Sequence, residues 1–251
     1  MKLHLPGLPL TIATAVILAA SLLPVRAADG PTPFPDAKAD SAWPGQGVIR
    51  VHPWMSDNRS YFWTQREKDK GAVVFVGDSL TGNWKSLAAS FPGLKVANRG
   101  IGGDVSRGVL FRFKEDVLDL KPEAIVINIG SNDLSAHGDP ATIEANIKEL
   151  IRQARDYKAG VPIIVCTIPP RDKADSPAKP GAYADINTRI LKLGKPGKDF
   201  EVLDLFTLYA NKEGKPANPE HFAADKLHLA EPGYQVWAEA LKPVFKRMDI
   251  K

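Results

Sequence analysis

The sequence predicts a doubly wound α/β sandwich, in which helices cover both faces of a parallel sheet. Two observations support this fold class. Short apolar runs, nearly continuous in Val, Ile and Leu, occupy residues 72–76, 95–98, 124–129, 162–168 and 201–205. Such runs are typical of strands whose two faces are both covered. Longer segments with helical periodicity lie between them, and this alternation indicates crossover helices that link parallel strands.

Helices are expected over residues 57–70, 105–120, 140–157, 181–193 and 231–247. The third of them follows Asp139, a favourable N-cap, and has Pro140 in its first helical position. Residues 28–47 are rich in Pro, Ala, Asp and Gly and lack periodicity. We therefore expect a linker or a surface arm there, followed by a single domain over residues 48–251.

Residues 1–27 have the composition of a secretory signal peptide. Lys2 precedes an apolar run over residues 8–23, and Val25-Arg26-Ala27 fits a small-x-small cleavage pattern. The run is short for a transmembrane helix, which needs about 20 residues, so we favour a cleaved leader over a retained anchor. The expectation is a secreted or periplasmic protein with no stable membrane insertion after cleavage.

Charge and cysteine content narrow the classes of function. The net charge of +4 falls to +2 without the leader, because Lys2 and Arg26 leave with it and no acidic residue does. The absence of a dense Lys/Arg cluster with interleaved aromatic residues disfavours nucleic-acid partners. The single cysteine, Cys166, lies in an apolar run, which favours a buried structural thiol over a catalytic one. Zinc-ligand spacing is also missing.

Four short motifs carry the candidate chemistry. They are Gly-Asp-Ser-Leu at 77–80, Gly-Ile-Gly-Gly-Asp at 100–104, Gly-Ser-Asn-Asp at 130–133 and Asp-Lys-Leu-His at 225–228. The first three each begin where a predicted strand ends. Ligands of open α/β sheets bind beyond the carboxyl ends of the strands, so these three motifs are expected on one rim.

The first and fourth motifs contain the parts of an activated serine. Ser79 needs a base to remove its proton, and His228 can serve while Asp225, three residues earlier, holds the other imidazole nitrogen. The structural alternatives are a serine N-cap, a helix-capping aspartate and a surface histidine. His221 is a rival base, but Asn218 rather than a carboxylate precedes it by three residues.

The second and third motifs contain candidate donors to a developing oxyanion. The backbone N–H groups of Ser79 and Gly103 and the side-chain amide of Asn132 can supply them. The alternatives are a tight turn at Gly103 and an Asx turn at Asn132. A dinucleotide-binding loop would need glycine where Val105 stands and would normally follow the first strand, so we do not favour it.

These motifs resemble those of the SGNH, or GDSL-type, hydrolase family, which is named after its catalytic Ser, Gly, Asn and His. The resemblance spans residues 73–245. The residues that would take these roles here are Ser79, Gly103, Asn132 and His228, with Asp225 completing the triad. The resemblance implies a flavodoxin-like three-layer α/β/α sandwich with a five-stranded parallel sheet, and no metal or organic cofactor.

Residues 98–104 and 169–171, with Arg112, are similar to the branch that contains the catalytic subunits of platelet-activating-factor acetylhydrolase and their bacterial relatives. This likeness implies a serine esterase acting on short-chain acyl, in particular acetyl, esters of a small molecule, glycan or lipid. A thioesterase or lysophospholipase, a non-catalytic carbohydrate- or lipid-binding module and a metal-dependent hydrolase are the alternatives. Asp104 and Arg112 have two interpretations that the sequence does not separate. They can support the second motif by hydrogen bonds and charge, or they can be ordinary helix-start and surface residues.

Overall fold

The computed structural model describes Met1, residues 29–172 and residues 178–251, so the predicted leader lies outside the described residues apart from Met1. Five parallel strands form one sheet in the order β2-β1-β3-β4-β5. They are β1 (Val73–Gly77), β2 (Val96–Gly100), β3 (Ala124–Asn128), β4 (Ile163–Cys166) and β5 (Phe200–Leu203). The predicted parallel sheet is confirmed, and its strands agree with the expected runs to within two residues at each end.

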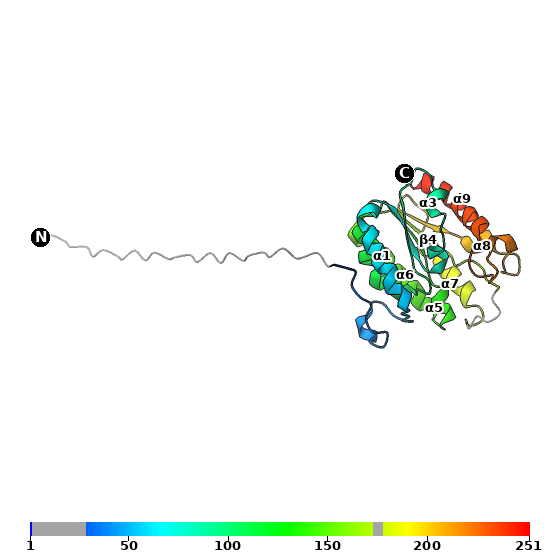
Figure 1. Cartoon of the computed structure of the whole chain (residues 1–251), viewed down its shortest axis with the longest axis horizontal. Helices are drawn as coiled ribbons and strands as arrows, with labels where there is room; N and C mark the ends of the chain where they lie inside the picture. Colours follow the sequence, from blue (N-terminus) through cyan, green and yellow to red (C-terminus); the bar gives the residue numbers. More distant parts are fainter. Residues whose placement is uncertain (2–28, 173–177) are drawn as a thin grey trace.

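Helices pack on both faces of this sheet and complete three layers (Figure 1). The helices of one face are α1 (Pro53–Asp69), α4 (Ser106–Asp116), α6 (Pro140–Tyr157) and α7 (Ala182–Leu191). Those of the other face are α2 (Ser79–Gly82), α3 (Leu87–Ser90), α8 (Leu205–Tyr209) and α9 (Glu231–Arg247). The carboxyl ends of the strands are left to the loops that carry the motifs.

The strands alternate their side chains between two apolar cores. Val74 and Val76 of β1 pack in the core beneath α4, α6 and α7. Val73 and Phe75 pack in the core beneath α9. All five residues of β1 and of β3 are buried, because each face of a central strand meets a helical layer. This double covering explains why the strands read as continuous apolar runs.

The helix boundaries depart from expectation where the local signal is short. Helices α6 and α9 match their predicted ranges, whereas α1 begins earlier, because Pro53 occupies its first turn after an extended His52. Helix α4 ends at Asp116, and a separate 3₁₀ turn (Leu118–Leu120) follows. Helices α2, α3, α8 and α5 (Ser131–Ser135) have only four or five residues and were not predicted, because so few residues show no helical period.

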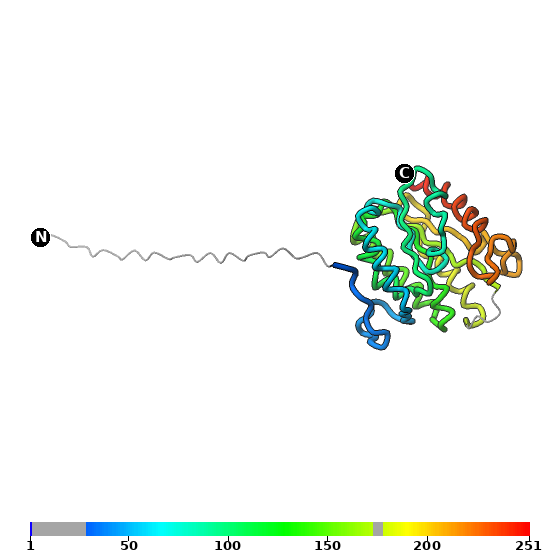
Figure 2. Tube along the Cα trace, viewed as in Figure 1, coloured from blue at the N-terminus to red at the C-terminus, as the bar shows by residue number. Residues whose placement is uncertain are grey.

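Residues 29–47, blue at the lower edge of the domain in Figure 2, contact α4 through side chains. Trp43 is buried and packs with Phe34 and with Phe111 of α4. Arg107 of α4 donates to the backbone oxygens of Trp43 and Pro44. A buried guanidinium that satisfies backbone carbonyls in this way ties the segment to the domain.

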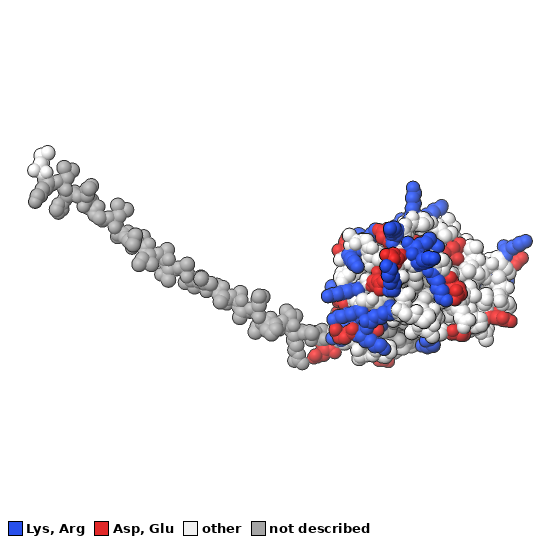
Figure 3. Space-filling model, turned by 90° about the horizontal axis from the view of Figure 1, so that it is seen from above, with Lys and Arg blue, Asp and Glu red and all other residues white. Residues whose placement is uncertain are grey.

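The surface carries both signs of charge. On the face shown in Figure 3, basic and acidic side chains stand next to one another. Exposed pairs such as Lys114–Asp119 are of this kind, and pairs of this type add little stability. Within residues 29–172 and 178–251, the helices lack the combination of length and apolar character required to cross a membrane.

Candidate active site

Ser79 is the first residue of α2 and follows the end of β1 at the carboxyl rim of the sheet. A Cβ on Gly77, the last residue of β1, would come within 2.0 Å of the backbone oxygen of Asn128, so only glycine fits there. Asp78 is the N-cap of α2 and accepts from the backbone N–H of Leu80 at 2.9 Å. Asp78, not Ser79, therefore caps this helix, and the serine hydroxyl is free for another partner.

That partner is His228, which lies 149 residues further along the chain. Its Nε2 is 2.8 Å from Ser79 Oγ, and its Nδ1 is 2.5 Å from Asp225 Oδ2. The other oxygen of Asp225 accepts from the backbone N–H groups of Leu227 and His228, both at 3.0 Å. The structure thus brings the three predicted triad residues into one hydrogen-bonded line.

Asp225 keeps its negative charge in this arrangement. Partial burial pushes its pKa upward, but hydrogen bonds from the His228 side chain and from two backbone N–H groups outweigh burial and bring the pKa to about 2. An ionised Asp225 accepts from Nδ1–H, which leaves Nε2 to accept from the serine hydroxyl. The proton positions follow from these partners.

The rival base lies elsewhere in the same loop. Nε2 of His221 is 3.3 Å from the side-chain amide of Asn218, and its ring meets the edge of Tyr209. His228 is the histidine in contact with Ser79.

The second motif passes directly beside Ser79. A Cβ placed on Gly102 would lie 3.9 Å from Cβ of Ser79. Gly103 has a φ of +85°, and a Cβ there would meet the His52 ring at 2.8 Å. The turn at Gly103 therefore requires glycine on two counts, as the tight-turn alternative expected, and Gly102 is the glycine that lies beside Ser79.

Asn132 spans from α5 to the second motif. Its Nδ2 donates to the backbone oxygen of Asp104 at 3.0 Å and lies 3.4 Å from Asp78 Oδ2. Its Oδ1 accepts from Nη1 of Arg50 at 3.3 Å. The side chain thus bonds to distant partners rather than to the local backbone of an Asx turn.

Arg112 and Asp104 form a buried ion pair beneath these loops. Nε of Arg112 is 2.8 Å from Asp104 Oδ2, and its Nη2 donates to the backbone oxygen of Gly77 at 3.2 Å. Both side chains have at most 1% of their surface exposed. Of the two interpretations left open by the sequence, the structure supports the first, because the pair connects the end of β1 to the second motif.

Three carboxyl groups of the motifs, those of Asp78, Asp104 and Asp133, are buried. Burial raises the pKa of Asp78 to about 7, and the nearby carboxylates of Asp104 and Asp133 push it in the same direction. Burial also raises the pKa of Asp133 to about 6, although this side chain accepts from the N–H and hydroxyl of Ser106. Among the described residues, no group of three or more His, Cys, Asp or Glu side chains is placed to hold a metal ion.

The sequence motifs did not include three residues that border the site. Arg50 contacts Asn132, His52 contacts Gly103, and Trp54 donates from Nε1 to the backbone oxygen of Gly102 at 2.8 Å. They precede or begin α1, far from the strand ends that located the motifs. The early start of α1 at Pro53 was the only local signal, and it does not indicate proximity to Ser79.

Comparisons with known proteins agree with this geometry. Residues 71–236 match the GDSL-like lipase/acylhydrolase family. The alpha2 subunit of platelet-activating factor acetylhydrolase IB from Rattus norvegicus is 30% identical over 200 residues, which cover 76% of this chain and 81% of that subunit. The human alpha1 subunit is 27% identical over 231 residues, covering 88% and 90% of the two chains.

Solved structures show the same fold. A GDSL-like lipase from Bacteroides thetaiotaomicron has a TM-score of 0.61 at 25% identity, over 72% of this chain and 89% of its own. A lipase/acylhydrolase from Enterococcus faecalis has a TM-score of 0.55 at 23% identity, over 70% and 95%. Because the matched residues 71–236 include all four motifs, the chain belongs to the GDSL-like lipase/acylhydrolase family, as the SGNH resemblance predicted, and is an ester-hydrolysing enzyme.

Proposed function

We propose that this protein is an exported serine esterase for short-chain acyl esters, in particular acetyl esters. The observation that carries the proposal is the hydrogen-bonded line from Ser79 Oγ through both nitrogens of His228 to Asp225. This line contains a nucleophile, a base and a group that orients the base, which is the arrangement that acyl transfer through a serine requires.

The reaction follows from these positions. Ser79 Oγ attacks the ester carbonyl carbon while His228 Nε2 takes the hydroxyl proton, and the carbonyl oxygen becomes an oxyanion. The tetrahedral intermediate expels the alcohol, which receives the proton from His228, and leaves an acyl-serine. Water then attacks the acyl carbon, again losing a proton to His228, and the bond to Ser79 Oγ breaks as His228 returns that proton to Oγ and the acid is released. Asp225 stabilises the His228 imidazolium both in the formation of the acyl-serine and in its hydrolysis.

Three groups are the donors that we propose for the oxyanion. The N–H of Ser79 belongs to the first turn of α2, where N–H groups have no partner within the helix. The others are the backbone N–H of Gly103 and the Asn132 amide, one N–H of which would have to turn from Asp78 Oδ2 to the substrate. Preorganised donors of this kind are each worth about 10²–10³ in turnover.

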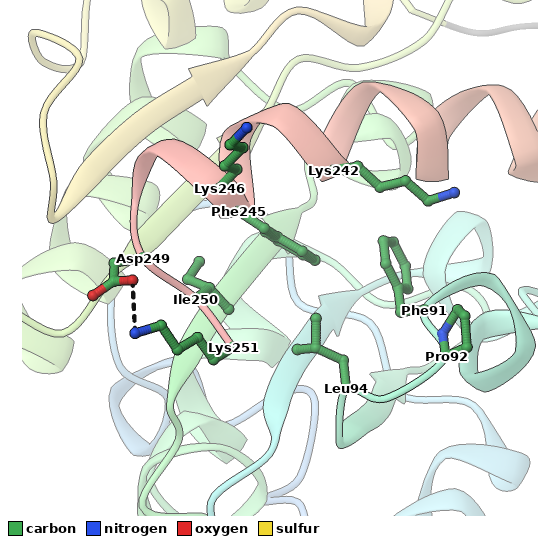
Figure 4. Close-up of a pocket in the computed structure, with 9 residues that line it drawn as sticks. All are labelled: Phe91, Pro92, Leu94, Lys242, Phe245, Lys246, Asp249, Ile250 and Lys251. Atoms are coloured by element: carbon green, nitrogen blue, oxygen red, sulfur yellow. Dashed lines mark ion pairs between the residues drawn. The ribbon is translucent and has the colours of Figure 1, made fainter.

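A short acyl group agrees with the placement of apolar space. The structure has an apolar cavity of about 460 Å³ whose lining includes Phe91, Leu94, Phe245 and Ile250 (Figure 4). It lies at the last turns of α9, whereas His228 directly precedes its first turn. Lys242, the first residue of α9 in the cavity lining, lies about 16 Å along the helix from Glu231, so the cavity is out of reach of a short acyl chain on Ser79. The acetylhydrolase activity in the names of the mammalian relatives also supports an acetyl group.

Hydrolysis of p-nitrophenyl esters from acetate to palmitate tests the proposal. We expect kcat/KM to be greatest for acetate, and Ser79→Ala to lower kcat by about 10⁴-fold or more. The matched control is Ser86→Ala, which removes only a surface hydrogen bond to Glu231 and should retain full activity. A preference for chains longer than about eight carbons would overturn the short-acyl proposal in favour of a lysophospholipase, and undiminished activity of Ser79→Ala would overturn the triad.

Export is tested separately. The proposal rests on the composition of residues 1–27, and it expects the expressed protein outside the cytoplasm with its N-terminus near Ala28. Fractionation of expressing cells, followed by mass measurement of the intact chain, distinguishes a cleaved leader from a retained one.

A further inference from the structure

Two aromatic rings from the start of α1 and the residue before it border the second motif. The rings of His52 and Trp54 stack with their centroids 4.3 Å apart and a 12° angle between their planes. His52 meets Gly103, and Trp54 donates to the backbone oxygen of Gly102. A Cβ placed on Gly102 would be 3.9 Å both from Cβ of Ser79 and from Nε1 of Trp54, so a single glycine separates the indole from the serine. We call His52 and Trp54 the aromatic wall.

Trp54 is exposed although it is held in place. Its exposed fraction is 48%, whereas Trp43, Trp84 and Trp237 have at most 4%. One edge of its ring is fixed by the hydrogen bond to Gly102, and one face is fixed by the His52 ring. A ring that is already immobilised loses little conformational entropy when a ligand covers its free surface, which favours its use as an anchor for a ligand.

We propose that Trp54 binds a sugar ring whose acyl ester lies at Ser79, so that the physiological alcohol is a carbohydrate. This inference rests on the proposed esterase function and names its substrate class. A pyranose has an apolar C–H face that can pack on an indole and a rim of hydroxyl groups. Around the wall, the Arg50 guanidinium and the His52 imidazole supply polar partners for such a rim.

The same surroundings disfavour a lipid alcohol. A chain of methylene groups gains by covering apolar surface, but the contacts of Trp54 at the site are the His52 imidazole and the backbone oxygen of Gly102. The apolar cavity of about 460 Å³ is at the other end of α9. One flat ring among polar groups suits a ligand that is itself apolar on one face and polar at its edges.

The experiment compares an acetylated sugar with an acyclic acetate. Xylose tetra-acetate and ethyl acetate are hydrolysed by the full mature chain, and acid release is followed by pH-stat titration. We expect the wild type to prefer the sugar ester, and Trp54→Ala to lower that preference, as a ratio of kcat/KM values, about tenfold through KM. Trp54→Phe should retain most of the preference, because it keeps a ring face and loses only the hydrogen bond to Gly102.

Tyr61→Ala is the matched control. Tyr61 is another exposed aromatic residue of α1, 61% exposed and seven residues further along, and its removal should leave both substrates unaffected. Equal losses on both substrates in Trp54→Ala would overturn the proposal, because they would mean that Trp54 only supports the Gly102 loop.

Two further results would also overturn it. If the wild type does not prefer the sugar ester to ethyl acetate, the alcohol is not a carbohydrate. If the wild type also prefers phenyl acetate to ethyl acetate, and Trp54→Ala lowers that preference as much as it lowers the preference for the sugar ester, the alcohol is an aryl alcohol. Failure of the proposed esterase function is recognised separately, by Ser79→Ala retaining activity on ethyl acetate.

Discussion

Two carboxyl groups in the surroundings of Ser79 have opposite ionisation behaviour. Asp225, from the exposed loop before α9, has 43% of its side chain exposed and a pKa of about 2. Asp78, at the end of β1, is 1% exposed and has a pKa of about 7. At Asp225 hydrogen bonds to the charged form lower the pKa by more than burial raises it. At Asp78 loss of hydration raises the pKa by more than its hydrogen bond lowers it.

Ser79 therefore lies between two regions that have different roles. The loop side, Asp225 and His228, holds a charge in contact with the reacting groups. The buried side, Asp78, Asp104 and Arg112, holds the turns that place the serine and its neighbouring N–H groups. Changes on the loop side should therefore affect turnover, and changes on the buried side should mainly affect stability.

The largest expected effect is on the loop side. Asp225→Asn should lower kcat by about 10³–10⁴, because a neutral amide neither fixes the required tautomer of His228 nor stabilises its imidazolium. Steady-state hydrolysis of p-nitrophenyl acetate measures this, with little expected change in thermal stability. Asp172→Asn is the control, since Asp172 is a nearby surface carboxylate whose ion-pair partners among the described residues are Lys215 and Lys226. Similar rates for the two variants would contradict the assignment.

On the buried side, Arg112→Met should lower the free energy of unfolding by about 3–5 kcal/mol. The change leaves the buried Asp104 carboxylate without its partner, and an uncompensated buried charge is costly. Urea denaturation gives the value. Lys114→Met on the same helix removes an exposed pair with Asp119 and should cost less than about 1 kcal/mol. Comparable losses would show that burial of the Arg112 pair is not what matters.

Asp78→Asn should change how stability depends on pH. The folded-state pKa of Asp78 is about 7, above the ordinary value of 3.8, so the folded state binds the proton more tightly than the unfolded state. The contribution of this proton to the free energy of unfolding is fully present below about pH 4 and is lost as the pH rises through about 7. Asparagine keeps the acceptor for the Leu80 N–H and has no proton to lose.

The measurement is denaturant unfolding at pH 5 and pH 8. The wild type should lose about 2–4 kcal/mol more than Asp78→Asn between the two values. Parallel pH dependences for the two proteins would mean that Asp78 does not have a raised pKa.

The smallest expected effect concerns Arg50, which contacts one of the proposed oxyanion donors. Arg50 donates to Oδ1 of Asn132, and this fixes the amide with its Nδ2 facing the Asp104 backbone oxygen and Asp78 Oδ2. On p-nitrophenyl acetate, which has no sugar ring for Arg50 to contact, Arg50→Met should lower kcat about three- to tenfold with little change in KM, because a misplaced donor weakens transition-state binding. Arg50→Lys should restore part of the loss. A change confined to KM would instead indicate a direct contact with substrate.

Most of the fold was predictable because its signals are local. Continuous apolar runs marked strands buried on both faces, and helices α6 and α9 carry Pro within the first two positions of the helix. The four- and five-residue helices α2, α3, α5 and α8 were not predictable, since they are too short for a period and depend on their neighbours. The early start of α1 was missed although Pro53 indicates it.

The parallel sheet, the rim on which three motifs lie and the residue types needed for acyl transfer could all be predicted from the sequence. They depend on strand ends and motif spacing, which are local properties of the chain. The tertiary structure decided which histidine meets Ser79, that Asp78 rather than Ser79 caps α2, and that Arg112 is buried against Asp104. It also decided that Trp54 stands beside the serine. These outcomes depend on distances between residues far apart in the chain and on burial, and neither can be obtained from the order of residues alone.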